Sequence, residues 1–230
     1  MRVAVVVFPG TNCEHDIVHA LHLAGADSDL VWHRDTDLGG ADAVVLPGGF
    51  AHGDYLRTGA IARFSPVMSE VERIADDGRP VLGICNGFQI LCEAGLLPGA
   101  LVANRDLKFI CKPVHLRVES TDSVLTRAAR VGDVLRIPLN SYEGNYVATD
   151  AAAIEAGGNV ILRYSDADGS VSEASNPNGS TNAIAGIAND RRNVAGLMPH
   201  PERASEEILG SSDGMVLINS FVASVEAVPA

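Results

Sequence analysis

The chain has 230 residues, 47% of them hydrophobic, and a formal net charge of −12 at pH 7. The negative charge argues against nucleic-acid binding, because neutralising phosphates requires a basic surface. No apolar run approaches the roughly 18 residues of a membrane span, and the apolar N-terminus is too short for a signal peptide. We therefore expect a globular protein with one α/β domain over residues 1–230 and no nucleic-acid or membrane partner.

Strands and amphipathic helices alternate in the first half of the chain. Apolar residues at positions 17, 20, 21 and 24 form one helical face, and Gly25 suits the C-cap of that helix. A second apolar helical face runs from Phe64 to Ala75. We expect strands at 2–8, 30–32, 43–46 and 81–84, and helices at 14–24, 64–75 and from Phe88 onward.

The second half is dominated by strands. We expect these at 114–118, 134–137, 159–163, 183–187 and 193–197, with a last helix near 213–225. The helices between the early strands predict a doubly wound, mostly parallel sheet flanked by helices. Functional sites of such sheets lie beyond the carboxyl ends of the strands. Gly10, the Gly48-Gly49 turn and Cys85 fall at such ends.

Cys85 lies where a predicted strand turns sharply into a predicted helix. The run from Gly83 to Gln89 has the strand–nucleophile–helix layout of hydrolases that carry serine at this position. Its glycines allow close backbone approach, and a helix N-terminus favours a thiolate. A buried cysteine is also ordinary core material, so this run alone leaves both interpretations open.

A candidate base follows 115 residues later, in Met198-Pro199-His200-Pro201-Glu202-Arg203. A cysteine nucleophile needs a base, and the base needs a group that fixes its tautomer. His200 and Glu202 are two residues apart in a segment that two prolines hold extended. Their side chains are thus expected to meet, although a solvated surface loop is the simpler alternative.

A third candidate feature is the turn Pro47-Gly48-Gly49-Phe50, which directly follows a predicted buried strand. Attack by a thiolate on an amide creates an oxyanion, which two backbone N–H groups usually stabilise. The N–H group of Gly49, or of a neighbour, and that of Asn86 are the candidate donors. Pro-Gly-Gly is also a common plain turn.

Taken together, GICNGFQ, PGGF and MPHPER resemble the class I, triad-type glutamine amidotransferases. A narrower resemblance is to the glutaminase subunit of phosphoribosylformylglycinamidine synthase. It rests on four stretches: FPGTNCEHD at 8–16, the GDYLR stretch within 47–68, NPNGS at 176–180 and MPHPERA at 198–204. The resemblance extends from Val3 to about Phe221. It implies the flavodoxin-like fold of class I amidotransferases and a single domain of this kind.

The resemblance also implies a reaction and partners. Cys85, His200 and Glu202 would hydrolyse glutamine, and Gln89 would help to hold it. Ammonia would pass to a separate synthetase subunit that uses ATP and Mg²⁺, in a complex with a small accessory subunit. No cofactor or metal is expected in this chain.

The chain departs from the subfamily at one place. Where the subfamily usually reads close to PIAHGEGNY, residues 138–146 are PLNSYEGNY, so that Ser141-Tyr142 replace His-Gly. The departure puts glutamine contacts, or docking of the synthetase, in question.

Other interpretations of the chain also stay open. It could serve another ammonia acceptor, act as a free-standing γ-glutamyl hydrolase, or be an inactive interaction module.

Four cysteines without metal spacing or a pairing pattern indicate a reducing cytosol. The chain has two lysines and 15 arginines. This excess of arginine fits either adaptation to a high-salt cytoplasm or the base composition of the genome. His15, His19 and His22 share a side of the first helix, where a solvated face is favoured over zinc.

Overall fold

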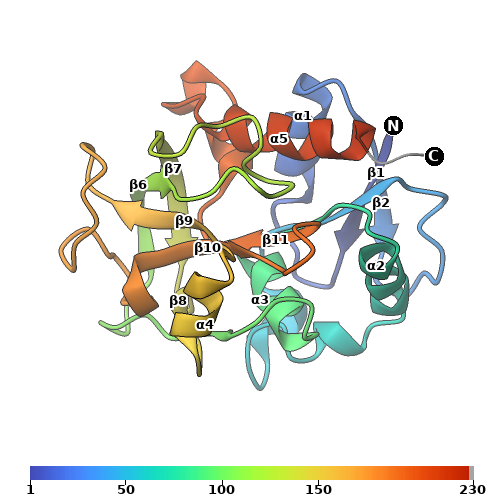
Figure 1. Cartoon of the computed structure of the whole chain (residues 1–230). Helices are drawn as coiled ribbons and strands as arrows, with labels where there is room; N and C mark the ends of the chain where they lie inside the picture. Colours follow the sequence, from blue (N-terminus) through green and yellow to red (C-terminus); the bar gives the residue numbers. More distant parts are fainter. Residues whose placement is uncertain (228–230) are drawn as a thin grey trace.

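A computed structural model describes residues 1–227 of the chain, which form a large mixed sheet between two layers of helices (Figure 1). Nine strands make this sheet: β1 (Arg2–Val7), β2 (Asp27–Trp32), β3 (Ala43–Leu46), β4 (Val81–Ile84), β6 (Ile110–Val118), β7 (Val134–Ser141), β9 (Val160–Ser165), β10 (Ile184–Ala188) and β11 (Val194–Leu197). Their order is β2-β1-β3-β4-β11-β10-β9-β6-β7.

The sheet has a parallel and an antiparallel half. β2, β1, β3, β4 and β11 are parallel, whereas β10, β9, β6 and β7 join on as antiparallel neighbours. The central parallel strands β3, β4 and β11 contain only apolar residues and glycine and are fully buried, since helices cover both of their faces, whereas the edge strand β2 is polar at its start and largely exposed. The doubly wound sheet expected from the sequence is thus confirmed, and its parallel half carries the strand ends where a site was expected.

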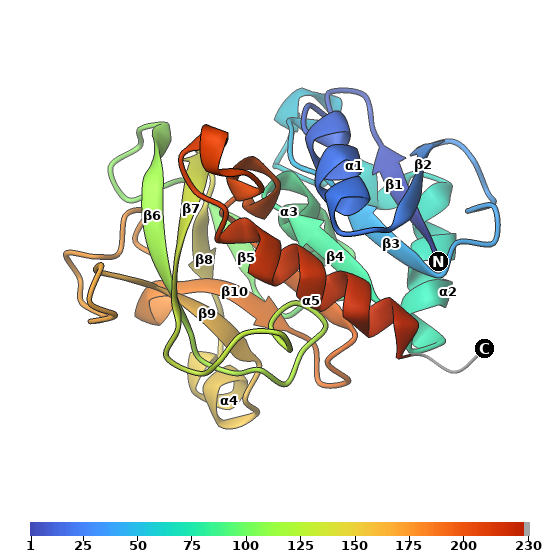
Figure 2. The ribbon, with the colours of Figure 1, turned by 90° about the horizontal axis from the view of Figure 1, so that it is seen from above.

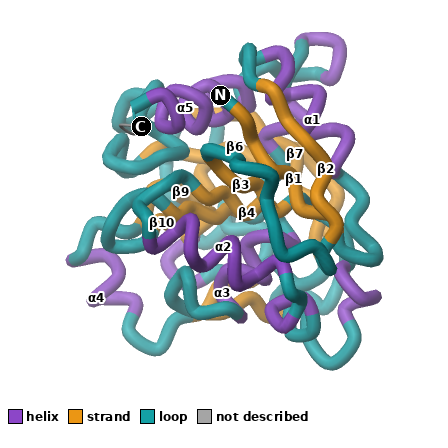
Figure 3. Tube along the Cα trace, turned by 90° about the vertical axis from the view of Figure 1, so that its right-hand side faces the viewer, coloured by secondary structure: helices purple, strands orange, loops and turns teal. Residues whose placement is uncertain are grey.

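Helices α1 (Glu14–Leu23) and α5 (Gly214–Glu226) cover one face of the sheet, and α2 (Val67–Asp76) and α3 (Asn86–Glu93) cover the other (Figures 1 and 2). The short helix α4 (Ala151–Ala156) precedes β9. The buried apolar side chains form one continuous core cluster. Seen from the side, the strands lie between α1 and α5 above and α2 and α3 below (Figure 3). Among residues 1–227, no helix combines the length and apolarity that a membrane crossing needs.

Two sequence-based expectations were wrong. Phe64 does not belong to the buried face of α2: it lies in a preceding 3₁₀ turn, is 74% exposed and stacks under the Arg63 guanidinium. The strand expected at 134–137 is longer than predicted, because β7 continues to Ser141, and β8 (Asn145–Val147) then pairs with β5 (Ala100–Val102) in a second small sheet. Helix α4, β5 and β8 were not expected.

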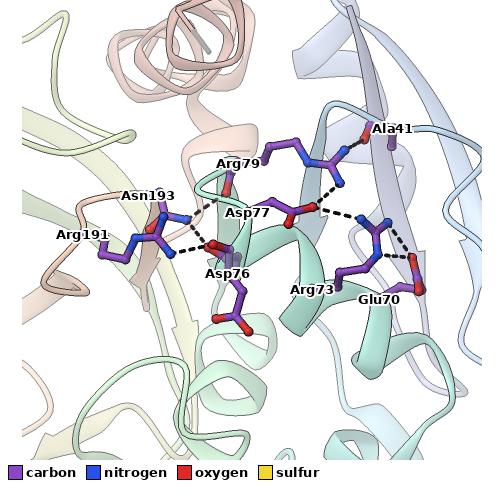
Figure 4. A network of polar contacts seen from close by, with 9 residues as sticks. Ala41, Glu70, Arg73, Asp76, Asp77, Arg79, Arg191 and Asn193 are labelled. Atoms are coloured by element: carbon purple, nitrogen blue, oxygen red, sulfur yellow. Dashed lines mark hydrogen bonds and ion pairs between the residues drawn. The ribbon is translucent and has the colours of Figure 1, made fainter. Parts of the chain in front are cut away.

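The amino ends of β4 and β11 are held by a network of polar contacts (Figure 4). Arg79 bridges the Ala41 carbonyl and Asp77, which also receives a hydrogen bond from Arg73. Asn193 donates to the Ala75 and Arg79 carbonyls. This network fixes the edge of the sheet at the amino ends of the strands. The candidate site lies at the opposite edge, at their carboxyl ends.

Candidate active site

Cys85 occupies a strained turn between β4 and α3. Its φ of 51° and ψ of −105° are rare for a residue other than glycine, and such strain persists only where the surroundings enforce it. A Cβ on Gly87 would lie 1.9 Å from the Leu46 carbonyl oxygen, so only glycine lets α3 approach β3 this closely. The Cys85 N–H donates to the Leu197 carbonyl (2.8 Å), which fixes the turn against β11.

His200 and Glu202 meet as the sequence predicted. His200 follows β11, and its Nδ1 lies 2.6 Å from Glu202 Oε1, with both residues 2% exposed. Burial lowers the pKa of His200, but the charges of Glu202 and Cys85 outweigh this, so that the pKa stands well above its ordinary value. Its other nitrogen, Nε2, is buried and has no hydrogen-bond partner among residues 1–227. One nitrogen is therefore fixed and the other is free for chemistry.

Gly48 packs directly against the histidine ring. A Cβ on Gly48 would lie 2.6 Å from His200 Cε1 and 3.1 Å from Cys13 Sγ. Because Glu202 also holds the ring at Nδ1, the ring has little room to move. Gly48 therefore has a steric role that the sequence analysis, which placed it near the oxyanion, did not foresee.

We expect Gly48→Ala to lower kcat by about 100-fold, because a small displacement of a catalytic group costs this much. Its φ is not positive, so alanine adds no backbone strain and the effect comes from the displaced ring. Gly25→Ala is the control, since φ is +82° there and nothing lies within 4 Å. It should cost stability without changing kcat. Equal kcat for Gly48→Ala and wild type, with matched melting temperatures, would contradict the steric role.

Two backbone donors are free where the oxyanion was expected. Within residues 1–227, neither the Gly49 N–H nor the Asn86 N–H donates a backbone or side-chain hydrogen bond. The Phe50 N–H is already engaged, since it donates to the Gly10 carbonyl oxygen at 2.8 Å. Gly49 and Asn86 are thus the donors that a developing oxyanion could use.

A pocket of about 300 Å³ brings the candidate residues together. Cys85, His200, Gly49, Phe50 and Gln89 all line it. The Gln89 side chain is held at both ends: its Nε2 donates to the Glu143 carbonyl (2.6 Å), and its Oε1 accepts from the Asn86 side chain (2.9 Å). Gly48, Asn86 and Glu202 do not line the pocket, but each contacts a side chain that does. The other lining residues are Asn12, Cys13, Asp54, Thr58, Phe109, Asn140, Ser141, Tyr142, Glu143 and Arg203.

The segment that departs from the subfamily forms part of this wall. Ser141 and Tyr142 both line the pocket. Two buried asparagines hold the segment from behind: Asn104 donates to the Ser141 carbonyl (2.8 Å), and Asn178 donates to the Gly144 carbonyl (2.7 Å). Asn178 belongs to the NPNGS sequence, so this motif positions the wall and does not itself line the pocket.

Cys13 and Arg203 are pocket residues that the sequence analysis missed. Cys13 Sγ lies 3.1 Å from Arg203 Nη2 and 3.9 Å from His200 Nδ1. Together with Glu202, Cys13 and His200 form a group of three metal-ligating side chains, whose ligand atoms all lie within 4.8 Å of one another. It is the only such group among residues 1–227. His15, His19 and His22 are exposed and join no such group, and His19 pairs with Glu206 (2.8 Å). The prediction of a solvated helix face is confirmed.

Residues 1–213 match the family model of the CobB/CobQ-like glutamine amidotransferase domain. The chain belongs to this family. A subunit of Salinibacter ruber named phosphoribosylformylglycinamidine synthase subunit PurQ is 52% identical, with 100% of this chain and 99% of the relative covered. The subunit of the same name from Rubrobacter xylanophilus is 54% identical, with 98% and 100% covered. The amidotransferase resemblance seen in the motifs is confirmed over the full chain.

Solved structures share the fold of this chain. A chain of PurLQS from Thermotoga maritima superposes with a TM-score of 0.87 at 43% identity, covering 96% of this chain and 97% of that one. A glutamine amidotransferase of the same organism has a TM-score of 0.61 at 16% identity, over 99% of both chains, and shares the fold.

Proposed function

We propose that this amidotransferase hydrolyses L-glutamine to glutamate and ammonia, with Cys85 as the nucleophile. The geometry at Cys85 carries the proposal: a strained cysteine at the start of α3 shares a pocket with His200, whose Nδ1 is held by buried Glu202. A nucleophile, a base and a group that orients the base are the parts that covalent amide hydrolysis requires.

The reaction begins with attack of the Cys85 thiolate on the amide carbon of glutamine. The N–H groups of Gly49 and Asn86 donate to the resulting oxyanion. His200, as the imidazolium, gives its Nε2 proton to the leaving nitrogen, so that ammonia departs and a γ-glutamyl thioester remains. The neutral His200 then takes a proton from water, which attacks the thioester and releases glutamate.

The surrounding groups support these steps. Glu202 keeps the tautomer of His200 fixed and stabilises its charged form. Gln89 shapes the pocket next to Cys85, and by resemblance to the family it helps to hold the substrate. No step requires a metal or cofactor bound to this chain.

We further propose that the ammonia passes to an ATP- and Mg²⁺-dependent synthetase subunit. That partner would convert formylglycinamide ribonucleotide to formylglycinamidine ribonucleotide in purine biosynthesis, in a cytoplasmic complex with a small accessory subunit. The relatives named for this synthase support the assignment, since they match this chain over nearly its whole length. The single core cluster within residues 1–227 supports the expected single domain.

Apolar side chains at the mouth of the pocket support docking of a partner there. Phe50, Phe109 and Tyr142 line the pocket and yet are 46%, 50% and 43% exposed. Large apolar side chains grouped at a functional opening are typical of surfaces that a partner covers. A synthetase seated on this rim would enclose the pocket and receive the ammonia.

We expect the lone chain to be a poor glutaminase that its complex activates. The measurement is kcat/KM for glutamine, first alone and then with synthetase, accessory subunit, ATP and formylglycinamide ribonucleotide. Activation by about tenfold or more corresponds to roughly 1.4 kcal/mol of transition-state stabilisation. Equal activity in both conditions would favour a free-standing hydrolase. No hydrolysis in either condition would favour an inactive interaction module.

A further inference from the structure

A group of metal-ligating side chains includes a thiol that the proposed hydrolysis does not use. Cys13 directly precedes α1, lines the pocket and is 2% exposed. Its Sγ lies 3.9 Å from His200 Nδ1, and Glu202 Oε1 lies 2.6 Å from the same nitrogen. All three residues are buried, and their ligand atoms lie within 4.8 Å of one another. A thiol, an imidazole and a carboxylate are thus held together in the interior.

The distances within this group suit a tetrahedral metal ion. Zinc binds cysteine sulfur at about 2.3 Å and histidine nitrogen or carboxylate oxygen at about 2.0 to 2.2 Å, which places neighbouring ligand atoms roughly 3 to 4 Å apart. Cys13 Sγ and His200 Nδ1 already have this spacing. Nδ1 and the Glu202 oxygen are joined by a hydrogen bond, and they would move slightly apart once a metal replaced its proton. Only small side-chain shifts are therefore needed.

Glu202 has an oxygen that no other group engages. Its Oε2 is buried and has no hydrogen-bond partner within residues 1–227, and the exposure of its side chain is 0%. A buried carboxylate oxygen without a partner is costly unless a ligand supplies one. This oxygen is an indication of a bound cation that is independent of the position of Cys13.

The neighbouring Arg203 is compatible with such an ion. Its Nη2 donates to Cys13 Sγ at 3.1 Å, and its Nε lies 3.3 Å from Asp16, which offsets the guanidinium charge. A thiolate can accept an N–H hydrogen bond and bind a metal at the same time, and such outer contacts commonly orient metal ligands. A thiolate, a carboxylate and a neutral imidazole together carry the charge that neutralises a divalent ion.

We propose that Cys13, His200 and Glu202 bind a zinc ion that inhibits this protein, with a water molecule from the pocket as the fourth ligand. Mixed sulfur, nitrogen and oxygen ligands are typical of zinc, whereas Mg²⁺ and Ca²⁺ prefer oxygen ligands. The ion can enter through the pocket, since Cys13 and His200 both line it. Starting from the thiol and the imidazolium, binding releases one proton from Cys13 Sγ and one from His200 Nδ1 to solvent.

Inhibition follows from the tautomer that the ion imposes on His200. With zinc on Nδ1, the remaining ring proton stays on Nε2, which is the nitrogen that has to accept a proton from water in the proposed hydrolysis. Glu202 then binds the ion and no longer orients the ring by a hydrogen bond. This effect on turnover rests on the proposed glutaminase function, whereas the binding of zinc does not depend on it.

Metal binding can be measured without any turnover. Titration of the metal-free chain with Co²⁺, a spectroscopic substitute for zinc, should give a single tetrahedral ion per chain with a thiolate-to-cobalt absorption band. Cys13→Ser should remove this band and weaken Zn²⁺ binding, measured by competition with a coloured chelator, by about 100-fold or more, since even the outer contacts of metal ligands are worth about 10- to 100-fold. Glu202→Gln should also weaken Zn²⁺ binding while keeping the band. Cys111→Ser, at an exposed thiol, is the matched control and should bind as the wild type does.

Cys85→Ser separates this site from a rival one, in which Cys85 and Nε2 of His200 hold the ion. It should keep the cobalt band and the wild-type affinity for Zn²⁺. Loss of the band in Cys85→Ser, its persistence in Cys13→Ser, or its absence from the wild type overturns the inference.

Zinc should also abolish glutamine hydrolysis by the wild-type complex, and a chelator should restore it. Cys13→Ser should keep hydrolysing glutamine at the zinc concentration that stops the wild type, and equal inhibition of the two proteins overturns the inference. A metal-free wild-type complex without glutaminase activity overturns the proposed function instead, and the cobalt titration then still decides whether the metal site exists.

Discussion

Cys85→Ser should lower kcat for glutamine hydrolysis by a factor on the order of 10⁶, close to complete loss. Serine keeps the size of the side chain but ionises far less readily, and a thiolate is the nucleophile that this site is built to use. His200→Ala should lose about as much, because the members of such a triad act as a unit. Release of glutamate by the purified variants, at equal melting temperature, is the measurement.

Cys13 is the rival nucleophile, since it lies in the same pocket near His200 and Arg203. Two observations favour Cys85. Cys13 lies 3.9 Å from Nδ1, the nitrogen that Glu202 already holds at 2.6 Å, and its own φ of −108° is unstrained. Cys13→Ser should therefore retain activity within about tenfold.

Covalent labelling separates the two thiols directly. A diazoketone analogue of glutamine should modify Cys85 alone, as located by peptide mass mapping. Cys92 and Cys111 serve as internal controls, one buried and one exposed. Modification of Cys13 with Cys85 untouched would refute the assignment, whatever the activities of the serine variants.

The local features around Cys85 could be predicted because they are encoded in neighbouring residues. The run from Val81 to Ile84 is a strand with the expected bounds, and glycines at 83 and 87 mark the close approach of backbones. The His200–Glu202 contact was predictable for the same reason, since both groups lie in one short segment. In such runs local sequence and tertiary structure agree.

The rest of the pocket comes from contacts between distant segments. Asp54 and Glu143 are 89 positions apart, and no local pattern marks them as neighbours. The three-residue strand β8 is too short to show a period, and its pairing with β5 depends on a partner about 45 positions away. Phe64 fitted a helical face by spacing alone, but the turn before α2 directs it to solvent.

Glu202→Gln should lower kcat by about 10⁴-fold, less than the loss for Cys85 or His200. The base remains, but a buried amide can present the wrong hydrogen-bonding group to Nδ1 and so select the wrong tautomer. In the wild-type protein the Glu202 carboxylate lies 2.6 Å from His200 Nδ1. Because Glu202 is only 2% exposed, water cannot take the place of the carboxylate. Glutamate release by the variant and by His200→Ala, measured side by side, gives the ranking.

The same substitution should shift the pH dependence in a defined direction. Burial lowers the pKa of His200, and the charges of Glu202 and Cys85 raise it above its ordinary value. Removing the Glu202 charge takes away one of the two charges that counteract the effect of burial. The pKa of His200 therefore falls, and the imidazolium loses its proton at lower pH. Protonation of the leaving nitrogen needs that imidazolium, and the alkaline limb of kcat/KM should therefore move to lower pH in Glu202→Gln. An alkaline limb at the wild-type position, together with a 10⁴-fold lower rate, would mean that Glu202 orients the ring without stabilising its charge.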